Sequence, residues 1–124
     1  MGASERRKGG DGERELVRLL RDHLGDGVCR NLQQSAVGGH DLLAVGRFAL
    51  EVKRCEKLSL NAWWEQAWRQ AIDAGCLPAL AYRQSRQPWR FVVPLSILLG
   101  NGYVGWPTAT VCIDGFAMIV RGVE

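Results

Sequence analysis

Residues 41–53, DLLAVGRFALEVK, constrain the fold of this chain more than any other segment. Two apolar runs flank a turn centred on Gly46, and this pattern predicts a β-hairpin. Side chains alternate between the two faces of a strand, so Glu51 and Lys53 share one face. In a hairpin paired about this turn, Asp41 lies opposite Glu51, with Cβ atoms about 5 Å apart. The segment therefore predicts two carboxylates and an ammonium group at the open end of an otherwise apolar hairpin.

This arrangement of charges indicates a particular chemistry. Two carboxylates so close together repel each other unless a cation lies between them, and hard oxygen ligands suit Mg²⁺, with Mn²⁺ as a substitute. The backbone carbonyl of Val52 is placed to supply a third oxygen. Protonated Lys53 cannot bind a metal, so it would orient or deprotonate an attacking water, or neutralise a pentavalent phosphorane. The segment favours metal-dependent phosphodiester hydrolysis, although a Glu-x-Lys at a strand end is by itself often only solvated charge.

Composition places the chain in an ordinary class. Its 124 residues fit one domain with its own core, and 47% apolar with 23% charged residues is typical of globular proteins. It has no apolar run of 18 residues and no apolar segment typical of a secretory signal, so we expect a cytoplasmic protein without a membrane partner. The four cysteines are too far apart for a zinc knuckle, and we expect reduced thiols, mostly in the core. Without a GxGxxG or P-loop motif, a nucleotide-binding enzyme lacks support.

Basic residues gather near the N-terminus of this chain, whose net charge is +3. Residues 1–10 are polar, charged and glycine-bearing, which predicts a flexible basic arm before a single domain over 11–124. The placement of these charges is consistent with a polyanion such as DNA. Arginines and lysines after the hairpin are further candidates, with plain surface solvation as an equal alternative. The basic residues in question are Arg6, Arg7 and Lys8 on the arm, Arg14, Arg18 and Arg21 on the first helix, and Arg54 and Lys57 after the hairpin.

Periodicity and turn residues predict the other elements. Leucines at three- and four-residue steps predict a helix over 12–24, and Asn61 is a good N-cap for a helix over 62–74. Residues 95–99 could form a short helix, and 110–121 a final hairpin with an Asp-Gly turn. The expected strands are 28–34, 41–45, 48–53, 78–82 and 89–93. This order predicts an α/β fold in which helices flank a mixed central β-sheet.

Two apolar features have competing explanations. Trp63, Trp64 and Trp68 crowd the second predicted helix. They could stack on splayed bases, but such a stripe more often packs a core or a dimer interface. Residues 103–123 carry few charges, which suggests that they are covered either by the core or by a second subunit.

Several motifs together resemble a known family. They are KGGDGERELVRLL at 8–20, a Ser/Gly loop, and HDLLA followed by LEVK. Over residues 8–82 the chain is similar to the archaeal-type Holliday-junction resolvases of the PD-(D/E)XK nuclease superfamily. The resemblance implies a restriction-endonuclease-like core in α-β-β-β-α-β order. It also implies an active site made of Glu13, Asp41, Glu51 and Lys53.

The resemblance assigns roles to further residues. Glu13 would complete the metal shell or bind a second ion, with the alternative that it only complements the helix dipole. Ser35, in the Ser/Gly loop, and Gln66, on the following helix, would belong to the DNA-binding site. His40 stands where family members often have proline, which leaves open a role of its own against that of a solvated loop histidine.

These observations predict a Mg²⁺-dependent, structure-selective DNA endonuclease that cuts branched DNA such as Holliday junctions. Cutting two symmetric strands needs two active sites in two-fold relation, so we expect a homodimer. Two alternatives stay open: another small nicking or restriction-type nuclease, and a non-catalytic DNA-binding module that kept the fold. The intact set of three acids and a lysine argues against the second alternative.

Overall fold

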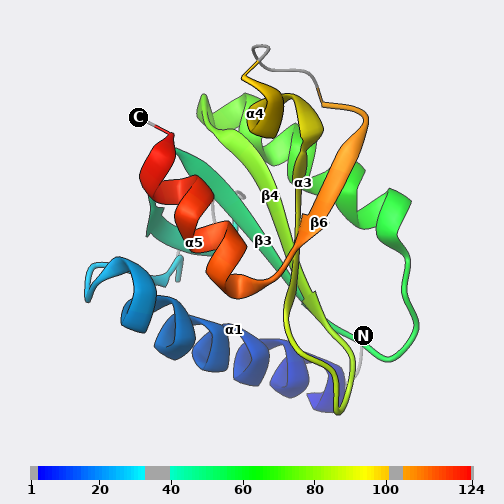
Figure 1. Cartoon of the computed structure of the whole chain (residues 1–124). Coiled ribbons are helices and arrows are strands. Elements are labelled where there is room, and N and C mark those ends of the chain that lie inside the picture. The colour runs from blue at the N-terminus through cyan, green and yellow to red at the C-terminus, as the bar shows by residue number, and fades with distance from the viewer. Residues whose placement is uncertain (1–2, 33–39, 101–104, 124) are drawn as a thin grey trace.

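A six-stranded sheet forms the centre of the computed structural model (Figure 1), which describes residues 3–32, 40–100 and 105–123, and side chains from residue 10 onward. Its strands follow one another in chain order across the sheet. They are β1 (Cys29–Arg30), β2 (Leu42–Val45), β3 (Phe48–Arg54), β4 (Leu77–Arg83), β5 (Arg90–Pro94) and β6 (Thr108–Val111). The predicted α/β fold with a mixed sheet is confirmed.

Only β3 and β4 pair in parallel, while every other neighbouring pair is antiparallel. Parallel neighbours need a crossover, and α3 (Leu60–Ala74) provides it. The N-cap of this helix is Ser59, two residues earlier than the predicted N-cap Asn61. The Trp63 N–H donates to the Ser59 carbonyl at 3.0 Å and so forms the first hydrogen bond of the helix. It ends at Gly75, whose φ of 67° is accessible to glycine at little cost.

Helices cover both faces of the sheet (Figure 1). On one face lie α1 (Ala3–Leu24) and α5 (Ile113–Gly122), and their fully buried Leu16, Leu20 and Phe116 pack on the sheet. The Phe116 ring stacks on Phe91 of β5, with centroids 4.5 Å apart. On the other face α3 buries Trp64 and a smaller apolar cluster. The core therefore lies on both sides of the central strands. Each fully buried side chain of this size stabilises the fold by about 1.5–3 kcal/mol.

The first helix is longer than the sequence predicts. It begins at Ala3 rather than at residue 12, so residues 3–10, expected as an arm, continue α1. Gly12 is buried in this helix, and a Cβ there would lie 2.9 Å from the Cβ of Arg54. The glycine therefore lets α1 lie close against β3. Tertiary contact of this kind outweighs the low helix propensity of the glycines.

The predicted hairpin over 110–121 is wrong. Residues 108–111 form β6, and α5 follows directly with Cys112 as its N-cap. The buried Phe116, Ala117 and Val120 recur at three- and four-residue spacing, which places one helical stripe on the core. The C-terminal apolar residues are thus largely covered by their own chain. The short helix α4 (Leu95–Leu99) occurs as expected, and β1 is shorter than expected.

The four cysteines are unpaired, as expected, but they do not lie in the core. Cys29, Cys55 and Cys76 are half-buried and Cys112 is exposed. All four lie at or next to an end of a strand or helix, where the chain leaves the core. Within the described ranges, none of the helices has the length and apolar character needed to cross a membrane.

Candidate active site

The β2–β3 hairpin contains a bulge that sets the geometry of the site. Val45 pairs with Phe48, so the turn is tighter than the sequence predicts. The register then shifts, and Leu42 pairs with Leu50. Ala44 lies within the shift, with a left-handed φ of 63°. The tighter turn alone would displace the pairing by one residue and turn the side chains to the opposite face of the strand. The bulge compensates for this shift, so residue 41 lies beside residue 51 as predicted.

Asp41 is fixed by hydrogen bonds at the open end of this hairpin. Its backbone N–H donates to the Leu50 carbonyl at 3.0 Å, and its carbonyl accepts from the Asn31 N–H at 2.8 Å. Its Oδ2 accepts a 2.7 Å hydrogen bond from the Val52 N–H. The N–H and C=O of a strand residue point to the same side, so the Val52 carbonyl points to the side of β3 on which Asp41 lies. The side chain is buried.

Glu51 is the most strongly perturbed group of the site. It is 4% exposed, and its Oε2 has no hydrogen-bond partner. The Nε2 of Gln66, from α3, approaches Oε1 to 3.5 Å, and the Lys53 Nζ lies 3.9 Å from the same oxygen. Burial, reinforced by the hydrogen bond and charge of Asp41, raises the pKa of Glu51 to about 9, while Lys53 lowers it in part. At neutral pH the Asp41–Glu51 pair therefore retains a proton.

Glu13 approaches the same site from α1. It lies in the middle of that helix, so it does not complement the dipole at the first turn. Arg30 of β1 donates from Nε to Glu13 Oε1 at 3.0 Å. Burial raises the pKa of Glu13, the charge of Asp41 adds to the rise, and Arg30 offsets part of it. The structure thus brings Glu13, Asp41, Glu51 and Lys53 to one end of the sheet.

Glu15, two residues further along α1, has a different environment. Arg83 Nη1 of β4 donates to both of its carboxylate oxygens, at 2.8 and 3.0 Å. The Trp89 Nε1 donates to Oε1 at 3.0 Å. These bonds tie α1 to β4 and to the start of β5, so Glu15 is a structural anchor, and Glu13 is the acid next to the carboxylate pair.

Sequence reasoning missed Arg30 and Asn31. Besides its backbone bond to Asp41, Asn31 donates from Nδ2 to the His40 carbonyl at 3.0 Å, which fixes the chain just before Asp41. The sequence places these polar residues in a predicted strand next to the hairpin. It does not show which residues of the hairpin they lie beside, because the strand register depends on the tertiary structure. His40 itself is half-buried, and burial lowers the pKa of its imidazole.

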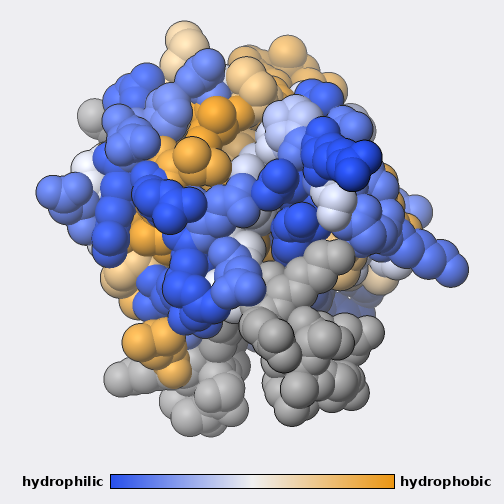
Figure 2. Space-filling view, turned by 90° about the horizontal axis from the view of Figure 1, so that it is seen from below, coloured by the Kyte–Doolittle hydropathy of each residue, from blue (hydrophilic) through white to orange (hydrophobic). Residues whose placement is uncertain are grey.

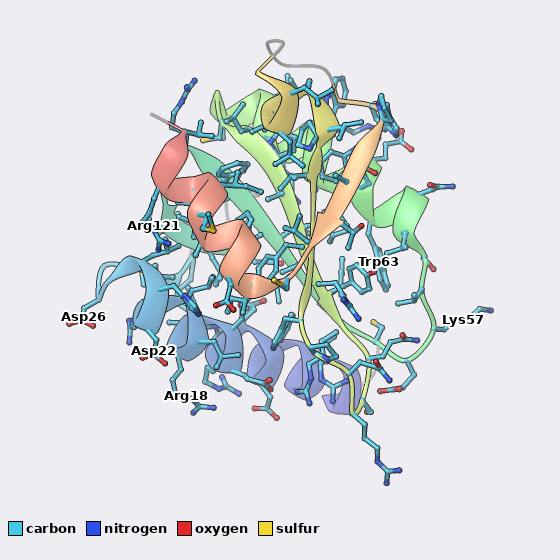
Figure 3. All side chains as sticks on the ribbon, in the orientation of Figure 1. Arg18, Asp22, Asp26, Lys57, Trp63 and Arg121 are labelled. Atoms are coloured by element: carbon cyan, nitrogen blue, oxygen red, sulfur yellow. The ribbon has the colours of Figure 1, made fainter. Side chains whose placement is uncertain are left out.

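The residues predicted to contact DNA are dispersed. Arg54 pairs with Glu56 at 3.2 Å and donates to Ser85, whereas Lys57 projects outward from the loop after β3 (Figure 3). Gln66 is the member of this group that reaches Glu51. Ser35 and the side chains of Arg6, Arg7 and Lys8 lie outside the part of the chain that is described.

The tryptophans of α3 pack within the molecule. Trp64 is buried and donates from Nε1 to the Gly105 carbonyl at 3.0 Å. Trp68 lies against Trp106, with ring centroids 5.7 Å apart. Trp63 contacts Tyr82 of β4 at a centroid distance of 6.4 Å, between α3 and the sheet (Figure 3). Intramolecular packing, one of the two explanations considered for this stripe, accounts for Trp64 and Trp68.

The donor set fits a divalent cation held by few protein ligands. Among the described residues, no group of three or more His, Cys, Asp or Glu side chains is arranged to hold a metal ion. Mg²⁺ does not need one, because it usually keeps several waters and binds one or two carboxylates. Asp41 and Glu51 supply two, and the unpartnered buried Oε2 of Glu51 is an acceptor that a cation would satisfy.

Comparison with known proteins places the chain in a family and identifies a related fold. Residues 4–108 match the model of a family described as "Phage putative PDDEXK endonuclease". A search of curated proteins finds no significant match. Among solved structures, the chain is similar to that of Archaeoglobus fulgidus Hjc, a Holliday junction resolvase from an archaeal hyperthermophile. The TM-score is 0.53 at 22% identity, over 90% of this chain and 88% of that one, which shows a shared fold.

The matched range spans most of the chain and contains the three residues of the D…E-x-K motif, Asp41, Glu51 and Lys53, together with Glu13 of α1. The chain therefore belongs to the family of phage PD-(D/E)XK endonucleases, and its fold is similar to that of the archaeal resolvase.

Proposed function

We propose that this protein is a Mg²⁺-dependent DNA endonuclease that acts on branched DNA, with Holliday junctions as the leading substrate. The observation that carries the metal dependence is the buried Asp41–Glu51 pair, in which Glu51 Oε2 has no hydrogen-bond partner. A buried carboxylate pair of this kind favours a bound cation. Family membership and the fold shared with a resolvase support the choice of DNA and of a branched substrate.

Residues of this chain would divide the work as follows. Asp41, Glu51 and the Val52 carbonyl would hold Mg²⁺, which when bound supplies positive charge to the phosphate and lowers the pKa of a water. Lys53, 3.9 Å from Glu51, would orient the attacking water or neutralise charge on the phosphorane. Gln66 would position Glu51 from the α3 side. Glu13 would add negative charge from α1 to the metal shell.

We further propose that the active form is a homodimer, because a four-way junction with two-fold symmetry needs two paired cuts. The C-terminal apolar segment gives this proposal less support than the sequence suggested, since Phe116 is buried in its own chain. Met118 and Trp106 remain 68% and 50% exposed. Light scattering with and without junction DNA measures the assembly. A monomer in both conditions would favour the nicking nuclease instead.

The test of function compares synthetic four-way junctions, flaps and linear duplexes of matched sequence, with Mg²⁺ and with a chelator. We expect cleavage of the junction, dependent on Mg²⁺. Asp41→Asn should abolish cleavage but leave binding in chelator largely intact, because it removes a metal ligand and no phosphate contact. Glu65→Gln, on the exposed face of α3, is the matched control and should cleave normally. Equal cleavage of all substrates would indicate a general nuclease, and none would indicate a DNA-binding module.

A further inference from the structure

A cavity of about 360 Å³ lies between α1 and β1, beside the active site. Seen from the side on which α1 is outermost, the surface is mainly hydrophilic, with apolar side chains visible between charged ones (Figure 2). We call this cavity the arginine groove, because four of its lining residues are arginines. The lining residues are Arg14, Val17, Arg18, Arg21, Cys29, Arg30 and Leu32.

Positive charge in the arginine groove is only partly compensated. Two of the four guanidinium groups form ion pairs, namely Arg14 with Asp11 and Arg30 with Glu13. Arg21 donates from Nε to a backbone carbonyl at 2.8 Å, a bond that holds the side chain but adds no negative charge. Within the described ranges, neither Arg18 nor Arg21 forms an ion pair with a carboxylate. Arg18 and the neighbouring Asp22 both point into solvent (Figure 3). Such a surplus of positive charge around one cavity favours a bound anion.

We propose that the arginine groove binds consecutive phosphates of the DNA strand that leads into the active site. This inference rests on the proposed nuclease function and identifies where that function holds its substrate. Guanidinium groups bind phosphate through two parallel hydrogen bonds, which makes arginine well suited to this contact. The ligand is therefore a phosphodiester backbone read without regard to base sequence.

The spacing of the arginines matches a DNA strand. Arg14, Arg18 and Arg21 lie on one stripe of α1, and seven residues of helix extend about 10 Å. Phosphates of one strand rise about 3.4 Å per nucleotide along the duplex axis, so a stripe that lies parallel to this axis spans about three of them. Arg30 connects the arginine groove with the active site, because it lines the groove and also pairs with Glu13 at 3.0 Å. A strand in the groove would thus run toward the Asp41–Glu51 pair.

The first experiment measures binding of a labelled four-way junction in chelator, so that it does not depend on cleavage. Arg18→Gln with Arg21→Gln should reduce the slope of log affinity against log salt by about 2, since each lost phosphate contact removes about 0.9. Arg86→Gln with Arg90→Gln removes the same charge from exposed positions outside the groove and should leave the slope nearly unchanged. An unchanged slope for the groove variant, or an equal loss in both variants, would overturn the proposal.

The second experiment uses the unmodified protein and needs no substitution. Cys29 lines the groove, whereas the exposed Cys112 does not, so a maleimide probe read by mass spectrometry compares the two thiols in one molecule. Saturating junction DNA in chelator should slow modification of Cys29 at least several-fold and leave Cys112 unaffected. Equal protection by millimolar inorganic phosphate would identify a free-anion site instead, and an unprotected Cys29 would refute the groove. Intact protection without any cleavage in Mg²⁺ would refute only the nuclease proposal.

Discussion

Replacing Glu51 with glutamine should stabilise the metal-free protein while abolishing its activity. Burial and the neighbouring Asp41 raise the pKa of Glu51 from 4.5 to about 9. Between these two values the folded chain holds a proton that the unfolded chain has released, so the free energy of unfolding falls as pH rises. The stability associated with this proton is fully present below the unfolded pKa and is lost as pH rises through the folded one.

The size of the effect follows from this proton. Each pH unit between the two pKa values costs up to about 1.4 kcal/mol, so the upper limit near pH 8 is about 5 kcal/mol. We expect about 2 kcal/mol, because structural relaxation and water penetration weaken such buried interactions. Glutamine has nearly the same shape, never needs the proton, and can donate from its amide to Asp41. For a chain of this size, the gain corresponds to an increase in Tm of roughly 6–10 °C.

Thermal and urea unfolding in chelator, at about pH 6 and about pH 8.5, provide the assay. The difference between Glu51→Gln and the unsubstituted protein should widen as pH rises. Glu65→Gln removes an exposed ion pair with Arg69 and should stay within about 0.5 kcal/mol at both pH values. Added Mg²⁺ should stabilise the unsubstituted protein and not Glu51→Gln, since only a chain that binds the ion gains from it. A destabilised Glu51→Gln protein at high pH, or equal stabilisation of both by Mg²⁺, would refute this account of the pair.

Three further predictions separate structural from functional residues. Glu15→Gln should lower the free energy of unfolding in urea by about 1–3 kcal/mol, because it weakens two side-chain contacts that hold α1. Glu13→Gln should barely change this stability and should suppress junction cleavage. The reverse pattern would contradict our assignment of the two residues. Gly12→Ala should cost about 1–3 kcal/mol because its Cβ would meet a side-chain carbon of β3 at 2.9 Å, while Gly27→Ala, whose nearest contact is 3.9 Å, should be close to neutral in the same measurement. Deleting residues 1–8 should lower the salt slope of DNA binding by about 3 units through loss of three basic side chains, and an unchanged slope would show that this segment does not contact DNA.

The sequence alone specified the elements whose signals are local. The hairpin, α3 and the strands β4 and β5 follow from apolar periodicity and turn residues within short windows. The carboxylates and the lysine of the site follow from the same alternation, because residues 41 and 51 are joined by a short turn. Local spacing was sufficient there, since few residues separate the groups that meet.

Only the tertiary structure decided the contacts between distant segments. The bulge at Ala44, the Arg30–Glu13 pair and the close approach at Gly12 each depend on how α1 and β1 pack against the hairpin. The C-terminal segment likewise forms β6 and α5, and Phe116 of α5 stacks on Phe91 of β5 in place of the predicted Asp-Gly hairpin. Such choices depend on apolar burial and charge neighbours that are remote in sequence, so no pattern within a single segment could have determined them.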